Sequence, residues 1–181
     1  MTRPAVFIAR RVFGDIVDRL RPHFDVRTHD GEAPLAQAGL IAALQGCAGV
    51  FVTGSEKIDA RLLDACPDLK AVCTMAVGYN NIDVPAGSAR GVVVTNAPGV
   101  LTETTADFGF ALMMAAARRL GEGKRYLLLC RWTHWGFDMF AGCDVHGATL
   151  VILGMDRIGQ SIARPGHAGF DMPVAYTNRS R

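Results

Sequence analysis

Apolar and polar positions divide the first half of this chain into two kinds of segment. Short apolar runs, typical of buried strands, occur at 5–9, 49–53, 69–75 and 92–95, and 25–28 could add a short strand. Amphipathic segments with apolar residues at helical spacing occupy 13–24, 34–45 and 59–66. Strands that alternate with helices predict a parallel sheet covered by helices on both faces.

The loops that follow these strands are the candidate binding loops. In open parallel sheets, ligands bind beyond the carboxyl ends of the strands. Three loops in such positions carry a glycine where the chain must turn tightly, namely 53–55, 76–79 and 96–99.

A long apolar helix is predicted next. Residues 104–107 have the shape of a capping box, with Asp107 in place of the usual Glu or Gln, and 108–119 consist almost entirely of helix formers. This segment is apolar nearly all round, so we expect it to be buried in a core or against a second subunit. Gly121 and Gly123 interrupt the pattern, a helix resumes over 124–132, and 132–147 reads as a loop that crosses between domains.

The last part of the chain has the pattern of a strand, a helix and a second strand. Residues 148–153 form an apolar run, Gly154 and Gly159 flank a turn, and 174–177 form the next apolar run. A complete nucleotide-binding domain of this kind normally has six strands, so we expect the unit to be incomplete.

The glycines at 154 and 159 match the outer positions of the dinucleotide fingerprint G-x-G-x-x-G. The central position holds Asp156, whose side chain and negative charge would stand where the pyrophosphate needs space. We further expect Pro165 and Gly166 to interrupt the helix. Dinucleotide binding therefore has two sequence features against it, and the alternative is a strand–turn–helix unit without a ligand.

The residues after the last strand bear on the choice of cofactor. An acidic residue there reads the ribose 2′-hydroxyl of NAD, whereas arginine accommodates the 2′-phosphate of NADP. The sequence has no acid at this place and instead reads Asn178, Arg179, Ser180 and Arg181. This favours NADPH over NAD, and the alternative is a solvated basic tail.

Composition narrows the classes of function. A formal net charge of +2, without a basic stripe, predicts no nucleic-acid partner. Neither a signal peptide nor an apolar stretch long enough for a bilayer is visible, so we expect a cytoplasmic protein without a membrane partner. The five cysteines have no C-x-x-C spacing, which predicts buried reduced thiols and no zinc site.

Five ordered motifs together resemble the D-isomer-specific 2-hydroxyacid dehydrogenases, most of all the glyoxylate/hydroxypyruvate reductases. The motifs lie at 77–83, 96–99, 104–107, 131–135 and 153–160. The resemblance covers the whole chain but little more than half of a family member. It implies an α/β fold, with a flavodoxin-like parallel-sheet substrate domain over 1–99 and an incomplete Rossmann dinucleotide-binding domain over 100–181.

The resemblance also implies residue roles for reduction of a 2-oxo acid to a D-2-hydroxy acid with NAD(P)H. The backbone amides of Val77 and Gly78 would hold the substrate carboxylate. The positions implied for the cofactor are Thr104, Gly154, Arg157, Ile158, Gly159, Asn178, Arg179, Ser180 and Arg181. The helix over Ala106–Ala117 would form part of a homodimer interface.

The family's catalytic arginine, glutamate and histidine lie downstream of the matched region, so no catalytic residue is assigned and we expect the chain to be inactive by itself. Two alternatives stay open. The chain could be a non-catalytic flavodoxin-like module that binds carboxylates or dimerises, or it could be a relic gene product.

Overall fold

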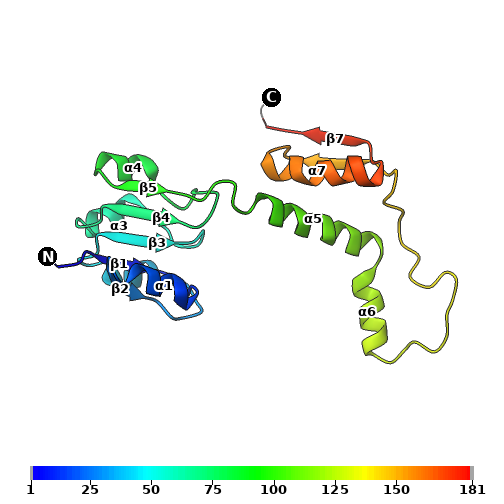
Figure 1. Ribbon diagram of the computed structural model, residues 1–181, viewed down its shortest axis with the longest axis horizontal. Coiled ribbons are helices and arrows are strands. Elements are labelled where there is room, and N and C mark those ends of the chain that lie inside the picture. The colour runs from blue at the N-terminus through cyan, green and yellow to red at the C-terminus, as the bar shows by residue number, and fades with distance from the viewer. Residues whose placement is uncertain (1, 180–181) are drawn as a thin grey trace. The chain divides into compact units, whose positions relative to one another are not determined.

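The computed structural model describes residues 2–179 and forms two compact units, Met1–Pro98 and Gly99–Arg181 (Figure 1). Among the described residues, no helix has the length and apolar character needed to cross a membrane. Each unit has its own cluster of buried apolar side chains.

The first unit is a five-stranded sheet of short strands joined by helices. In chain order its elements are β1 (Ala5–Ile8), α1 (Gly14–Leu20), β2 (Asp25–Thr28), α2 (Gln37–Ala43), β3 (Gly49–Val52), α3 (Ala60–Ala65), β4 (Ala71–Thr74), α4 (Val84–Ala89) and β5 (Val93–Thr95). The strand order is β2-β1-β3-β4-β5, and every neighbouring pair is parallel. This is the flavodoxin order, so the predicted fold class is confirmed.

The core of this unit lies between the sheet and helices α2 and α3. Val50 of β3 is in register with Phe7 of β1 and with Val72 of β4, and all three side chains are buried. Leu40 of α2 and Leu62 of α3 belong to the same buried cluster. Apolar residues on three adjacent strands therefore give the two helices a continuous surface to cover.

Helices flank both faces of the sheet, as expected, but their distribution is uneven. Right-handed crossovers from β2 to β3, β3 to β4 and β4 to β5 run in one direction across the sheet, so α2, α3 and α4 fall on the same face. Only the crossover from β1 to β2 runs the other way, which leaves α1 alone on the second face. An open apolar groove remains beside α1, lined by residues such as Leu20, Phe51 and Cys73.

The second unit consists of α5 (Thr102–Ala117), α6 (Leu120–Leu128), β6 (Leu150–Leu153), α7 (Arg157–Phe170) and β7 (Val174–Thr177). β6 and β7 pair in parallel as a two-stranded sheet. Helix α7 packs against β6 and against α5 (Figure 1). The small core contains Leu150, Ile152 and Met172, with Met113 of α5 and Ile162 of α7 packed against them.

Two expectations about α5 and α6 need correction. The segment 104–107 is not a capping box, because α5 already begins at Thr102 and its N-cap, Leu101, makes no side-chain cap hydrogen bond. Gly121 and Gly123 do not interrupt a helix either, since both lie inside α6. The break comes two residues earlier, at Arg119, whose left-handed backbone (φ 51°) separates α5 from α6.

Three further corrections concern the second unit. Helix α7 runs through Pro165 without ending, because its packing on β6 and α5 offsets the roughly 3 kcal/mol that an interior proline costs. Residues 132–147 connect α6 to β6 within this unit and do not cross between units. Of the five free cysteines, Cys130 and Cys143 are exposed, since both lie at turns or irregular backbone.

Candidate active site

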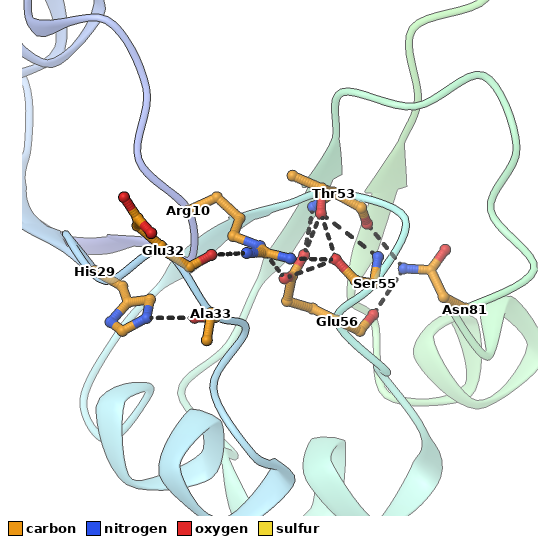
Figure 2. A network of polar contacts seen from close by, with 8 residues as sticks. All are labelled: Arg10, His29, Glu32, Ala33, Thr53, Ser55, Glu56 and Asn81. Atoms are coloured by element: carbon orange, nitrogen blue, oxygen red, sulfur yellow. Dashed lines mark hydrogen bonds and ion pairs between the residues drawn. The ribbon is translucent and has the colours of Figure 1, made fainter.

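The carboxyl edge of the five-stranded sheet gathers a network of polar side-chain and backbone groups from four successive loops (Figure 2). Arg10 follows β1, Glu32 follows β2, Glu56 follows β3 and Asn81 follows β4. Because the strands are parallel, all of these loops emerge at the same edge. This is the edge at which the sequence placed the binding loops.

Glu56 is the centre of this network, and its side chain is fully buried. Its Oε2 accepts hydrogen bonds from the backbone N–H of Thr53 (2.7 Å) and from the Thr53 hydroxyl (2.8 Å). Its Oε1 accepts from Arg10 Nε (2.9 Å) and from the Ser55 hydroxyl (3.2 Å). Both carboxylate oxygens are thus satisfied, which is the condition under which a buried charge is tolerated.

The environment of Glu56 holds its carboxyl group in the charged form. Burial by itself raises the pKa of Glu56, but the hydrogen bonds from Thr53 and from the Arg10 guanidinium outweigh burial and lower the pKa below the ordinary value of 4.5. The carboxylate is therefore a fixed negative anchor beneath the loops at neutral pH.

Arg10 and Asn81 extend the anchor to neighbouring loops. Arg10 donates from Nη1 to the carbonyl of Glu32 (2.8 Å) and from Nη2 to the hydroxyl of Ser55 (2.8 Å). The amide of Asn81 donates to the carbonyls of Thr53 (3.0 Å) and Glu56 (2.7 Å). Four loops at the edge are thereby fastened to one buried carboxylate (Figure 2).

The loop after β4 carries the two residues predicted to bind a carboxylate, Val77 and Gly78. The loop after β5 supports this segment: Asn96 donates to the carbonyl of Val77 (2.8 Å), and the N–H of Ala97 donates to the carbonyl of Ala76 (3.1 Å). Within residues 2–179, neither Val77 nor Gly78 donates its own N–H to a protein acceptor. Both residues are exposed, so two adjacent backbone donors remain available at this edge.

Two residues of this network, Glu56 and Arg10, were not among the predicted site residues. Glu56 directly follows the predicted binding loop at 53–55, and Arg10 directly follows the predicted strand at 5–9. A usable signal existed, since each follows the end of a parallel strand, where polar side chains must meet.

The glycine loop of the second unit has the backbone that a nucleotide fold requires. Gly154 has φ 99°, a conformation that L side chains rarely adopt, and it turns the chain sharply out of β6. A Cβ on Gly159 would overlap the carbonyl oxygen of Gly154, so only glycine lets α7 start this close to β6. Both glycines therefore have structural reasons to be where they are.

The amides of this loop, however, are taken by the chain's own side chains. Asp156 is the N-cap of α7, and its Oδ1 accepts from the N–H of Ile158 (3.1 Å) and of Gly159 (3.2 Å). The Asn178 side chain accepts from the N–H of Met155 (2.7 Å). A pyrophosphate needs such donors free, so the loop as it stands does not fit one.

The remaining positions implied for the cofactor lie in the second unit. Thr104 is exposed in the first turn of α5, and Arg157 begins α7. Arg179 is exposed beyond β7, whereas Ser180 and Arg181 fall outside the described residues. No group of His, Cys, Asp and Glu side chains within residues 2–179 has the arrangement to hold a metal ion.

The two units thus combine a flavodoxin-like domain that presents backbone donors at a sheet edge with a strand–glycine loop–helix unit of the dinucleotide-binding type. This combination defines the chain as a relative of nucleotide-dependent dehydrogenases.

Comparison with known proteins places the chain within one family. The family described as D-isomer specific 2-hydroxyacid dehydrogenase, catalytic domain, matches residues 6–181. The chain is 42% identical over 180 residues to the glyoxylate reductase of Korarchaeum cryptofilum, covering 99% of this chain and 54% of that protein. It belongs to the D-isomer specific 2-hydroxyacid dehydrogenase family.

Solved structures agree with this assignment. The TT0316 protein from Thermus thermophilus superposes with a TM-score of 0.92 at 38% identity, covering 98% of this chain and 57% of the other. An NADPH-dependent glyoxylate/hydroxypyruvate reductase from Sinorhizobium meliloti, in complex with NADP and malonate, superposes with a TM-score of 0.78 at 29% identity, covering 99% and 55%. The chain therefore spans about half the length of the relatives it matches.

Proposed function

We propose that this chain forms part of a reductase that converts a 2-oxo acid, such as glyoxylate or hydroxypyruvate, to the D-2-hydroxy acid. Residues 1–99 serve as the substrate domain, and 100–181 begin the nucleotide-binding domain. The observation that carries the proposal is the pair of available amides at Val77 and Gly78, on a loop held by Asn96 and by the Glu56 network. In such enzymes a bound nicotinamide cofactor supplies the hydride.

The loop after β4 suits the carboxylate of a small 2-oxo acid. Adjacent backbone N–H groups at the end of a strand form a concave set of donors for an anion. The loop gains rigidity from Thr74, whose hydroxyl accepts from the N–H of Ala76 (3.2 Å), and from Tyr79, whose carbonyl accepts from the N–H of Ile82 (2.9 Å). A preorganised donor pair binds its anion without a further cost of ordering.

For the cofactor side we propose NADP over NAD. The support is the sequence after β7, where Arg179 and Arg181 flank Ser180 without an acidic residue, together with the NADP found in the Sinorhizobium meliloti relative. Thr104 and Arg157 are further positions that we assign to this side, and Ile158 joins them only when Asp156 releases its N–H.

We expect the 181-residue chain to show no glyoxylate-dependent oxidation of NADPH by itself. Reduction of a carbonyl needs a proton donor beside the substrate. Within residues 2–179, His146 is the histidine that pairs with a carboxylate, and its Nε2 lies 3.3 Å from Oδ2 of Asp171. Both residues precede their strands, β6 and β7, and so stand at the opposite end of that sheet from the glycine loop. Turnover above the blank would contradict this expectation.

The carboxylate site is tested with oxalate, a stable mimic of a 2-oxo acid, titrated calorimetrically into the chain. Gly78→Pro removes one of the two N–H donors, and we expect it to weaken oxalate binding about 10- to 100-fold, the effect of one hydrogen bond to a charged group. Gly78→Ala is the matched control, because a Cβ at this position meets no atom within 4 Å and the N–H is kept. Equal affinity of the two variants would contradict the assignment.

The α5 helix is proposed as part of a homodimer interface. Phe108 and Leu112 lie one helical turn apart, and their side chains are 65% and 54% exposed. The other face of α5 packs on α7, so this stripe is the part of the helix left for a partner.

For the dimer we expect Leu112→Glu to shift the chain from dimer to monomer in sedimentation velocity runs at micromolar concentration, because a buried unpaired carboxylate opposes association. Phe13→Glu is the control, since Phe13 is also exposed (80%) but lies in the first unit. A wild-type chain that sediments as a monomer at about 100 μM, far above the micromolar scale of specific association, would rule out this interface.

A further inference from the structure

The glycine loop that follows β6 is closed by an anion that belongs to the chain itself. The Asp156 carboxylate occupies the N–H groups of Ile158 and Gly159, which a dinucleotide pyrophosphate would otherwise receive at the start of α7. The neighbouring donors are used as well, because Asn178 takes the N–H of Met155 and the carbonyl of Thr177 takes the N–H of Gly154 (2.9 Å).

We infer that Asp156 acts as an internal ligand of this loop, which stabilises α7 and lowers the affinity for the dinucleotide. The inference rests on the proposed function, since it concerns the cofactor of that same reductase. It assigns to one residue two effects of opposite sign: removing the carboxylate should weaken the fold and strengthen cofactor binding.

The stabilising effect follows from the position of Asp156 as the N-cap. An Asp side chain at an N-cap satisfies N–H groups that the helix itself leaves unpaired. Its charge also interacts favourably with the positive end of the helix dipole. Helix α7 gains particularly from such a cap because Pro165 removes one of its interior hydrogen bonds.

The effect on binding follows from competition for the same donors. Two negative groups cannot both occupy the N–H groups of Ile158 and Gly159, and a second anion brought beside the first is repelled. The glycine geometry itself remains intact, since Gly154 keeps its positive φ and Gly159 its close approach to β6. The obstacle is therefore a side chain, and a single substitution can remove it.

The experiment titrates NADPH into the full 181-residue chain, following the emission of the cofactor, and measures the melting temperature of each variant. We expect Asp156→Gly to bind NADPH at least about 10-fold more tightly than the wild type, equivalent to about 1.4 kcal/mol. We expect its melting temperature to fall by about 1 °C, because replacing an N-cap Asp by Gly costs a few tenths of a kcal/mol in a chain of this size.

Two further variants separate the causes. Asp59→Gly removes the N-cap of α3, where Asp59 accepts from the N–H of Leu62 (3.0 Å), so it should lower the melting temperature without changing NADPH affinity. Asp156→Asn keeps a good N-cap without the charge, so it should preserve the melting temperature and give an affinity between those of wild type and Asp156→Gly.

The inference is overturned if Asp156→Gly binds NADPH no more tightly than the wild type, or if its melting temperature does not fall. Oxalate titration of the same variant keeps this outcome distinct from a failure of the proposed function. Oxalate binding at Val77 and Gly78 with unchanged NADPH affinity leaves the reductase assignment standing and removes only the role of Asp156. A chain that binds oxalate and never binds NADPH favours a carboxylate-binding module without catalysis.

Discussion

Glu56→Gln is expected to lower the free energy of unfolding by about 3 kcal/mol, the scale of the loss when one partner of a buried ion pair is removed. The substitution leaves Arg10 without its carboxylate and places an amide N–H₂ group where Thr53 and Arg10 already present donors. Urea denaturation followed by circular dichroism measures the loss, and hydrogen exchange of peptides from β3 and β4 locates it in the first unit.

Glu32→Gln is the matched control for this prediction. Glu32 contacts Arg10 only through its backbone carbonyl, and its side chain is exposed, so the change should stay within about 0.5 kcal/mol. A loss below about 1 kcal/mol in Glu56→Gln would show that the network holds no more than a surface pair does.

The same carboxylate should make the first unit sensitive to acid. The pKa of Glu56 is lower in the folded chain than its ordinary value of 4.5, so its contribution to stability is fully present above that value and is lost as the pH falls through the folded pKa. Wild-type stability should therefore decline below about pH 4.5, and this part of the decline should be missing in Glu56→Gln. Identical acid profiles for the two proteins would contradict the assigned pKa direction.

Gly159→Ala is expected to destabilise the second unit by about 2–4 kcal/mol, the upper range for adding atoms to a packed contact. The new Cβ would overlap the carbonyl of Gly154 and approach Ile152 Cγ2 to 3.2 Å, so α7 must move away from β6. Because the obstructing atom is backbone, no side-chain rotation relieves the overlap.

Gly169→Ala in the same helix provides a control of opposite sign. No atom lies within 4 Å of the Cβ it would add, and alanine is favoured over glycine inside a helix by about 0.5–1 kcal/mol. Urea denaturation should therefore rank the proteins Gly169→Ala, wild type, Gly159→Ala in falling stability. Equal stability of the two variants would refute the role given to the close approach of α7 to β6.

Both experiments depend on features that the sequence indicated to different extents. The strands at 25–28 and 174–177 were predicted at their observed bounds, and the other strands within a few residues. Strands and helices were predictable because each leaves its own spacing of apolar residues along the chain, which is a local property of the sequence. The family resemblance, carried by five ordered motifs, was confirmed over residues 6–181.

Helix termini were less predictable. Thr104 had the sequence of a cap but lies inside α5, and Pro165 should have ended α7 but does not. In both places tertiary packing outweighs a local preference of at most about 3 kcal/mol. The prediction that Gly121 and Gly123 interrupt the helix was also wrong. The helix breaks at Arg119, whose left-handed backbone no glycine in the sequence indicated.

By itself the sequence determined the α/β class, the parallel direction of the strands and the candidate binding loops beyond their carboxyl ends, because hydrophobic period and turn residues are properties of neighbours in the chain. Only the tertiary structure showed that Arg10, Glu56 and Asn81 form one network. It also showed that Asp156, which was expected only to repel a pyrophosphate, caps helix α7. Those contacts depend on where parallel strands end in space and on which side chain lies within hydrogen-bond distance of an unpaired N–H. Neither quantity is a function of sequence spacing alone.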